Sequence, residues 1–213
     1  MLAPRFNSFP RQVMGANPIT LTEVLLDEVN LAVWQRALSH PIECFAETLL
    51  NIREPLSESF MLELNDEIEP DLSQLARAYS SLDGYQQFLA DVSGLVGAYG
   101  CLLGVRRVGV RLRALDRSMC PRFHVDHVPV RLITTYAGLA SEWLSEGGMS
   151  RSRLGDPTAE PHDPALIHPL RPGDVALLKG EKWLGNEGAG IIHRSPQPPE
   201  GMRRLILTLD WLS

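Results

Sequence analysis

The chain contains 213 residues, of which 44% are hydrophobic and 22% are charged, and its formal net charge is −6. These values are typical of an ordinary globular protein with one domain, or with one domain and an appendage, that buries a substantial core. The negative net charge and the lack of a Lys/Arg run argue against nucleic acid as a partner.

Membrane insertion and export are not indicated either. Residues 1–18 are polar and contain prolines where a secretory signal would be apolar, and the longest apolar stretch, residues 95–105, is too short to span a bilayer. The three cysteines, Cys44, Cys101 and Cys120, are widely spaced and fit neither a disulfide framework nor a zinc ribbon. We therefore expect a cytoplasmic protein without a membrane partner.

The first elements along the chain are mixed. After an irregular leader over residues 1–19, the apolar runs at residues 21–26 and 30–34 predict short strands. Pro41 predicts the start of a helix that ends near residue 50. Residues 60–64 predict another strand.

The strongest helix signal lies between Tyr85 and Leu103, where apolar residues repeat at i, i+3, i+4 and i+7. Asp83 and Gln86 resemble a capping box at its start. A weaker helical spacing follows Pro70. The wide apolar stripe of the main helix predicts packing against a sheet.

From residue 107 the apolar period changes from 3.6 to 2, which predicts strands. Strands are expected over residues 107–114, 119–126, 129–136, 174–178, 190–193 and 204–211, and a Gly-, Ser-, Pro- and Asp-rich segment over residues 137–171. Arg111 and Arg113 occupy alternating positions, and this pattern favours a solvated strand face over an anion site.

Helices followed by short strands predict an α+β fold. We expect a mainly helical region with a few strands over residues 1–105, packed on a jelly-roll or cupin-like barrel over residues 106–213.

A candidate metal site lies in the second half of the chain. His124 and Asp126 are two residues apart in an extended run, so their side chains share one face. His193 is the natural third ligand. Two histidines and one carboxylate, with the other positions open, form the facial triad of non-haem Fe(II) enzymes. Cys120 shares the parity of His124, but a straight strand separates the two by about 13 Å, too far for one ion.

The order of these motifs resembles that of the Fe(II)/2-oxoglutarate-dependent dioxygenases. Those enzymes have H-x-D on one strand, a distal histidine on a later strand, and a basic residue about ten positions beyond it. His124, Asp126 and His193 match the metal positions, and Arg203 or Arg204 matches the basic position. The resemblance implies a double-stranded β-helix, Fe(II) as the metal, 2-oxoglutarate as cosubstrate, and hydroxylation of an unassigned small-molecule or protein substrate.

Strand parity favours Arg204 over Arg203 for the cosubstrate carboxylate. Arg203 shares its face with a row of leucines, whereas the face of Arg204 is more polar. A guanidinium suits a carboxylate because the two can form paired hydrogen bonds. Arg131, Thr135 and Tyr136 are further candidates for cosubstrate binding, with Arg131 and Thr135 on one strand face and Tyr136 on the other.

Most of the chain is also similar to a bacterial family of unknown function, family 1826, which implies no reaction. The similarity runs from Asn30–Trp34 through Met119–Asp126 to the carboxyl terminus. A metal-binding or metal-homeostasis protein is therefore the alternative hypothesis. In that case zinc would occupy the same three ligands, with Cys120 or a loop histidine completing a closed site. The two loop histidines, His162 and His168, are otherwise expected to be solvated.

Overall fold

The computed structural model describes residues 10–65 and 69–212. Within these ranges the main element is a seven-stranded sheet with the order β1-β2-β8-β5-β10-β4-β3. β1 is parallel to β2, and every other neighbouring pair is antiparallel. The strands are β1 (Arg11–Gly15), β2 (Val29–Trp34), β3 (Leu56–Glu63), β4 (Arg107–Leu115), β5 (Val130–Ala137), β8 (Val175–Lys179) and β10 (Arg204–Trp211).

A three-stranded sheet of order β7-β6-β9 lies against one face of the large sheet. Its strands are β6 (Glu142–Leu144), β7 (Ile167–Pro169) and β9 (His193–Arg194). Apolar side chains from both sheets form a buried cluster between them, which includes Leu31, Val33, Ile133, Trp143, Leu178 and Ile206. The two sheets therefore form the layers of a sandwich.

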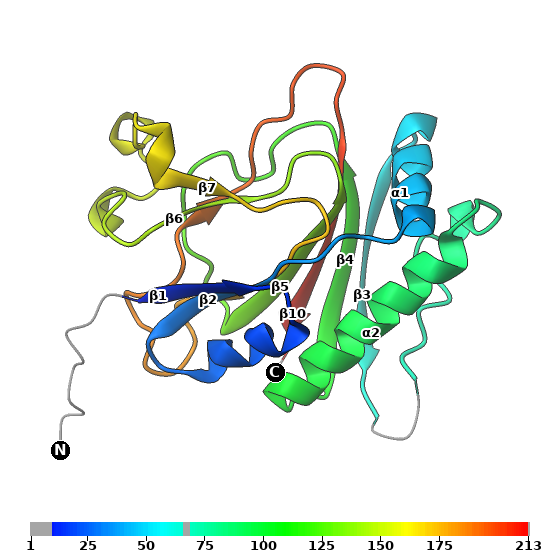
Figure 1. Ribbon diagram of the computed structural model, residues 1–213, viewed down its shortest axis with the longest axis horizontal. Helices are drawn as coiled ribbons and strands as arrows, with labels where there is room; N and C mark the ends of the chain where they lie inside the picture. The colour runs from blue at the N-terminus through cyan, green and yellow to red at the C-terminus, as the bar shows by residue number, and fades with distance from the viewer. Residues whose placement is uncertain (1–9, 66–68, 213) are drawn as a thin grey trace.

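Helices cover the other face of the large sheet, as Figure 1 shows for α1 and α2. The helices are α1 (His40–Ile52) and α2 (Tyr85–Leu103), with 3-10 helices η1 (Pro18–Leu25), η2 (Arg77–Tyr79), η3 (Arg151–Arg153), η4 (Pro157–Ala159) and η5 (Pro164–Leu166). The apolar faces of α1, α2, η1 and η2 pack on the alternate residues of the strands, such as Leu205, Leu207 and Leu209 of β10. The intervening residues of β10, including Arg204 and Ile206, face the small sheet.

Several predicted elements are confirmed. α1 and α2 match the predicted helices, and the predicted strands at residues 30–34, 60–64, 107–114, 129–136, 174–178 and 204–211 correspond to β2, β3, β4, β5, β8 and β10. Of the strand predicted over residues 190–193, only His193 lies in β9. Periodic apolar patterns thus located the elements that carry the main core.

Other predictions are wrong near the amino terminus. Residues 21–26 belong mostly to η1, because the Asn17 side chain accepts a hydrogen bond from the Ile19 amide and Pro18 begins a helical turn. Leu21 and Val24, three residues apart, then point into the core. The predicted leader also contains β1, and its residues 1–9 lie outside the described residues.

Two predictions around the helices are wrong as well. Residues after Pro70 form turns and the short η2 in place of a longer helix. The cap of α2 is Gly84 in the left-handed conformation, with no side-chain cap hydrogen bond, so Asp83 and Gln86 do not form a capping box.

The α+β class is confirmed, with mostly sheet and few helices. Among the described residues, the segment expected to be mainly helical also supplies β1, β2 and β3 to the large sheet. The two predicted regions thus share one sheet, and the division at residue 105 stays a prediction.

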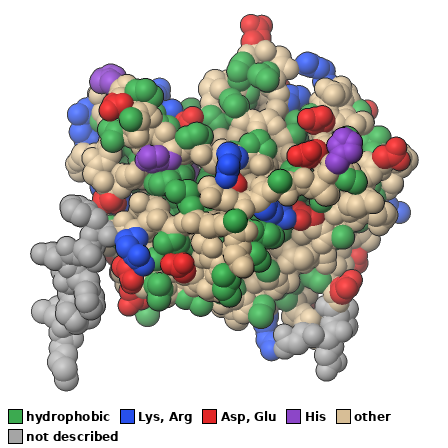
Figure 2. All heavy atoms as spheres, viewed as in Figure 1, with side chains coloured by type: hydrophobic (Ala, Val, Ile, Leu, Met, Phe, Trp, Pro, Cys, Tyr) green, Lys and Arg blue, Asp and Glu red, His purple; other side chains and the backbone are tan. Residues whose placement is uncertain are grey.

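Charged side chains of both signs are scattered over the face of the molecule shown in Figure 2, among hydrophobic ones. None of the helices in residues 10–65 and 69–212 has the length and apolar character needed to cross a membrane. The cytoplasmic location stays a prediction.

Candidate metal centre

His124 and His193 are brought together by their own backbones. The two residues form an isolated antiparallel bridge, in which the His124 amide donates to the His193 carbonyl at 3.0 Å and the His193 amide donates back at 2.9 Å. Residues paired in this way lie directly opposite each other and project their side chains to the same face. The imidazole ring centroids are consequently 4.6 Å apart.

The strand predicted over residues 119–126 is absent: apart from the bridge at His124, this segment is loop. Pro121 has no amide hydrogen to contribute to a ladder, and the segment has no continuous partner strand. The side-chain convergence of His124 and Asp126 therefore comes from loop conformation, and the alternation expected of a strand does not produce it.

A second backbone pairing holds Asp126. The amide of Glu181 donates to the Asp126 carbonyl at 2.9 Å, and the amide of Lys182 donates to the Val128 carbonyl at 3.2 Å. Gly180 lies between these contacts, where a Cβ atom would collide with the carbonyl oxygens of Asp126 and Val128. The residue after β8 must therefore be glycine for the Asp126 loop to approach this closely.

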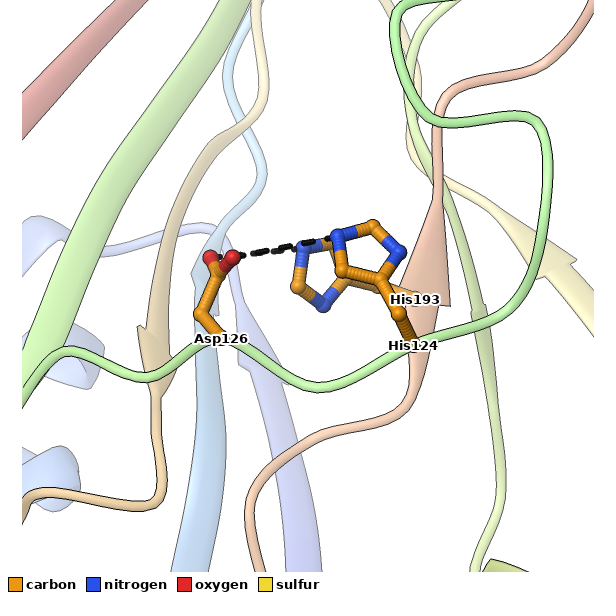
Figure 3. A group of neighbouring side chains, drawn as sticks. All are labelled: His124, Asp126 and His193. Atoms are coloured by element: carbon orange, nitrogen blue, oxygen red, sulfur yellow. Dashed lines mark ion pairs between the residues drawn. The ribbon is translucent and has the colours of Figure 1, made fainter. Parts of the chain in front are cut away.

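The three predicted ligands meet at one point, as Figure 3 shows. One ligand atom from each of His124, Asp126 and His193 lies within 4.8 Å of the other two. The Nε2 atoms of His124 and His193 are 3.8 Å and 3.4 Å from the two Asp126 carboxylate oxygens. Ligands at right angles on one ion, each about 2.1 Å from it, are about 3 Å apart, so small side-chain movements would bring all three into bonding range.

The remaining ring nitrogens have backbone partners. Nδ1 of His124 lies 2.9 Å from the carbonyl oxygen of Arg122, and Nδ1 of His193 lies 3.1 Å from that of Ile191. Because a carbonyl only accepts, both Nδ1 atoms carry the proton and donate, which leaves both Nε2 lone pairs facing Asp126. Carbonyl partners of this kind orient metal-binding histidines.

Burial lowers the pKa of His124, and the neighbouring His193 lowers it further. Burial raises the pKa of Asp126, but His193, in the form protonated on both ring nitrogens, and the charge of Arg131 outweigh it and hold that pKa well below its ordinary range. A neutral imidazole and an ionised carboxylate are the protonation states that bind a metal. The donor set therefore fits a divalent transition metal.

An ion-pair network positions the carboxylate. The Arg131 guanidinium donates to Asp126 Oδ2 at 2.7 Å and to Asp210 Oδ1 at 2.7 Å, and Arg111 donates to Asp210 Oδ2 at 2.6 Å. With Oδ2 held by Arg131, Oδ1 is the oxygen that remains for a metal ion. Arg131 thus holds a ligand, and its predicted contact with the cosubstrate is not favoured.

A cavity of about 90 Å³ opens beside the three ligands. Its lining includes His124, His193, Arg111, Arg113, Arg131, Arg194, Leu115, Met119, Ile133, Ile206, Ser141 and Ser195. The prediction of a solvated strand face holds only in part, because the Arg111 side chain is 38% exposed but both Arg111 and Arg113 line this cavity.

Arg204 is fully buried next to this cavity. Its guanidinium donates to the hydroxyls of Ser195, Thr135 and Ser141 at 3.2, 3.4 and 3.1 Å, while its Nε atom has no hydrogen-bond partner among residues 10–65 and 69–212. Burial lowers the pKa of Arg204 to about 10, against the attraction of Glu142. No described carboxylate forms an ion pair with it within 4 Å, so the group is a charged donor without its usual partner.

The other predicted residues divide between the two faces of the sheet. Thr135 lies on the cavity face and contacts Arg204. Arg203 is not in the cavity, because its guanidinium donates to the carbonyls of Leu50 and Glu54 at the end of α1. Tyr136 also points to the helix face, where its hydroxyl donates to Asp91 of α2 at 2.7 Å. The predicted contacts of Arg203 and Tyr136 with the cosubstrate have no support in this geometry and stay predictions.

Cys120 lines the cavity but does not belong to the ligand group among the described residues. His168 is not a ligand either, since it stacks on Trp143 and bonds to the Ser145 hydroxyl. Asp210, Ser141 and Ser195 were not predicted. Asp210 could have been found from parity, because it shares a strand face with Arg204.

Comparison with known proteins gives a family and a fold. The sequence profile of a family described as "Protein of unknown function (DUF1826)" matches residues 15–210, which confirms the similarity inferred from the sequence. No curated protein matches the chain.

Solved structures with a similar fold include three oxygenase-related proteins. A protein assigned to the 2OG-Fe(II) oxygenase family from Caulobacter crescentus superposes with a TM-score of 0.50 at 14% identity, covering 95% of this chain and 86% of that one. The dioxygenase for auxin oxidation in rice has a TM-score of 0.50 at 11% identity, with coverages of 90% and 77%.

A protein described as a candidate oxygenase from Shewanella oneidensis has a TM-score of 0.51 at 10% identity, with coverages of 96% and 90%. At such identities the likeness establishes a shared fold. The sandwich is thus jelly-roll-like.

Proposed function

Since the chain belongs to the family of unknown function DUF1826 and has the fold found in 2OG-Fe(II) oxygenases, we propose that it is a non-haem Fe(II)- and 2-oxoglutarate-dependent oxygenase of the hydroxylase type. One observation carries the proposal: the cavity beside the His124, Asp126 and His193 group is lined by both histidines and by Ser141 and Ser195, which bond to the buried Arg204. A dicarboxylate that chelates the metal at one end could form an ion pair with this arginine at the other end.

Bound Fe(II) would activate dioxygen, with 2-oxoglutarate oxidised to succinate and CO₂ as one oxygen atom enters the substrate. His124, Asp126 and His193 would hold the ion and leave its other positions open. Arg204 would pair with the carboxylate of 2-oxoglutarate farther from the metal, as a charge-assisted and geometrically matched contact. The hydroxyls of Thr135, Ser141 and Ser195 would keep the guanidinium oriented.

The protein's own contribution is orientation and exclusion of water. Ile133 and Ile206 line the cavity with apolar surface, and Arg131 holds Asp126 through its second oxygen. A dry, apolar cavity around a charged centre strengthens electrostatic contacts within it.

The proposal is tested by loading protein purified without oxygen with Fe(II) and measuring the metal content, the affinity for 2-oxoglutarate and the release of succinate. We expect one iron per chain, 2-oxoglutarate binding that depends on the metal, and slow succinate release without added substrate. Iron binding without any affinity for 2-oxoglutarate would contradict the assignment.

Asp126→Ala should lower Fe(II) affinity by at least about tenfold, because the anionic ligand of the set is removed. Cys120→Ala, at a cavity residue outside the ligand group, should leave metal content unchanged. Metal analysis of both variants measures the difference, and equal losses would show that the ligand assignment is wrong.

The zinc alternative has less support in the geometry. A structural zinc site is closed by four ligands, whereas the group found among the described residues has three and does not include Cys120. The open set therefore favours a catalytic ion. Stoichiometric zinc after purification in the presence of excess Fe(II) would favour the alternative.

A further inference from the structure

Arg113 of β4 lines the cavity and, like Arg204 beside it, has no carboxylate partner among the described residues. Its Nη1 donates to the thioether sulfur of Met119 at 3.3 Å, and its Nε is buried with no hydrogen-bond partner in the described part of the chain. A thioether is a weak acceptor. No ion pair within 4 Å joins Arg113 to a described carboxylate, so its positive charge is not neutralised inside the part of the protein that the structure describes.

The neighbouring arginines show that this is not a general property of the cavity. Arg111 pairs with Asp210 at 2.6 Å, and Arg194 pairs with Glu142 at 2.7 Å. Arg131 pairs with both Asp126 and Asp210. Each of these guanidiniums already forms an ion pair with a carboxylate of the protein, whereas Arg113 forms none with a described carboxylate and can bind an external anion. Buried donors without partners are uncommon in proteins, and an anion bound in the cavity would satisfy this one.

The surroundings of Arg113 define what that ligand can be. In the pairing of β10 with β4, Arg113 lies opposite Ile206. Leu115, Met119 and Ile133 add further apolar surface to the same cavity wall. A ligand that satisfies both features has an anionic group at one end and an apolar body beside it.

We propose that Arg113 determines substrate specificity and that the substrate is a small organic oxyanion, a carboxylate or a phosphate ester. Its anionic group pairs with Arg113, and its apolar part lies along Ile206 toward the three metal ligands. This assignment rests on the proposed oxygenase function, in which Arg204 is occupied by 2-oxoglutarate. The two unpaired arginines then serve two different anions, one on the cosubstrate and one on the substrate.

The test uses protein loaded with Mn(II), which is redox-inert here, and saturated with 2-oxoglutarate so that Arg204 is occupied. Hexanoate, hexyl phosphate and the neutral hexanamide are titrated by isothermal titration calorimetry. We expect at least one of the two anions to bind at least tenfold more tightly than hexanamide, and the comparison of hexanoate with hexyl phosphate identifies the anionic group.

The variants assign this preference to a residue. Arg113→Gln should abolish the tenfold preference, Arg113→Lys should keep part of it, and both should bind 2-oxoglutarate as the wild type does. Arg117→Gln is the matched control, because Arg117 is exposed and does not line the cavity. Far-UV circular dichroism checks the fold, and Arg113→Lys replaces Arg113→Gln if the latter does not fold.

Equal binding of the anions and hexanamide, no binding of either anion, or an unchanged preference in Arg113→Gln would overturn the proposal. So would weaker 2-oxoglutarate binding in Arg113→Gln, since Arg113 would then hold the cosubstrate. If the wild type binds neither Mn(II) nor 2-oxoglutarate, the titration is made on the unloaded protein. Anion binding that depends on Arg113 in that case supports the anion site and rejects the oxygenase function.

Discussion

Asp126 and Arg204 are both ionised and largely buried, but only the charge of Asp126 is neutralised by a neighbouring side chain. Asp126 has Arg131 at 2.7 Å, so its charge is balanced within the fold. Arg204 has three hydroxyl acceptors and no described carboxylate within ion-pair distance. A buried charge without a counter-ion reduces stability. Such a cost is usual at binding sites, where the ligand later supplies the missing charge.

Arg204→Met tests this trade between stability and binding. The variant removes a buried charge and keeps an unbranched side chain of similar length, so the free energy of unfolding of the metal-free protein should rise or stay within about 1 kcal/mol. Its affinity for 2-oxoglutarate should fall by about tenfold to a hundredfold, because this is the usual contribution of a hydrogen bond between charged groups to binding. Chemical denaturation and calorimetric titration measure the two quantities.

Arg203→Met is the control, because that neighbouring side chain bonds to the end of α1. It should leave the 2-oxoglutarate affinity unchanged. A weaker affinity in Arg203→Met, with none in Arg204→Met, would reverse the assignment of the two arginines.

The element that carries two of the three ligands is a loop, and its neighbours hold it in place. His124 is fixed by its backbone pairing with His193, and Asp126 by the pairing of its carbonyl with the Glu181 amide. Both partners lie in segments that follow β8. The ligand geometry therefore depends on the segments after β8 as much as on the H-x-D motif.

Gly180→Ala tests this dependence. The added Cβ would collide with the backbone carbonyls of Asp126 and Val128, so the ligand loop must move away. Metal affinity should fall by about tenfold to a hundredfold, and the free energy of unfolding by about 1–3 kcal/mol. Metal titration and denaturant unfolding give both values.

Gly94→Ala in α2 is the matched control, since nothing lies within 4 Å of its added Cβ. It should stabilise the protein by about 0.4–1 kcal/mol without changing metal affinity. Normal metal affinity in Gly180→Ala would show that the ligand loop does not depend on this approach.

At the scale of the whole molecule, the large sheet separates an apolar core from a cavity lined by charged residues. Its helix face holds the main apolar core, and its other face holds the charged cavity. Lys179, at the end of β8, is an exception on the helix side: it is fully buried, donates to the Leu26 carbonyl at 2.8 Å and lies over the Trp183 ring. Burial lowers the pKa of Lys179 from 10.5 to about 8.

This shift makes stability depend on pH. Because the folded-state pKa of Lys179 is below its ordinary value of 10.5, the unfolded chain holds this proton more tightly, and stability rises as the pH increases from about 8 toward 10.5. Relative to Lys179→Met, the wild type should therefore gain roughly 2 kcal/mol between pH 7 and pH 10. Denaturant unfolding of both proteins across this range measures the gain.

Lys182→Met, at an exposed lysine three residues away, is the control and should show no such relative change. A constant difference between wild type and Lys179→Met at all pH values would mean that Lys179 is not destabilised by burial.

Much of the fold could be predicted because helix and strand periods are local properties of the backbone. The apolar repeat of α2 and the alternation in β4, β5 and β10 located the core, and the same alternation placed Arg204 on the cavity face. η1 could not be predicted, because a short apolar run fits a strand and a helical turn equally well.

The candidate metal ligands His124, Asp126 and His193, which the structure brings together, followed from residue chemistry and motif order. The sequence alone could not determine which side chains, distant along the chain, form ion pairs with one another. Arg131 pairs with Asp126, Arg111 with Asp210, and Arg113 with no described carboxylate. These outcomes depend on the order of the strands and the path of the loops. Only the tertiary structure sets both, because ion pairs form between neighbours in space, whatever their separation along the chain.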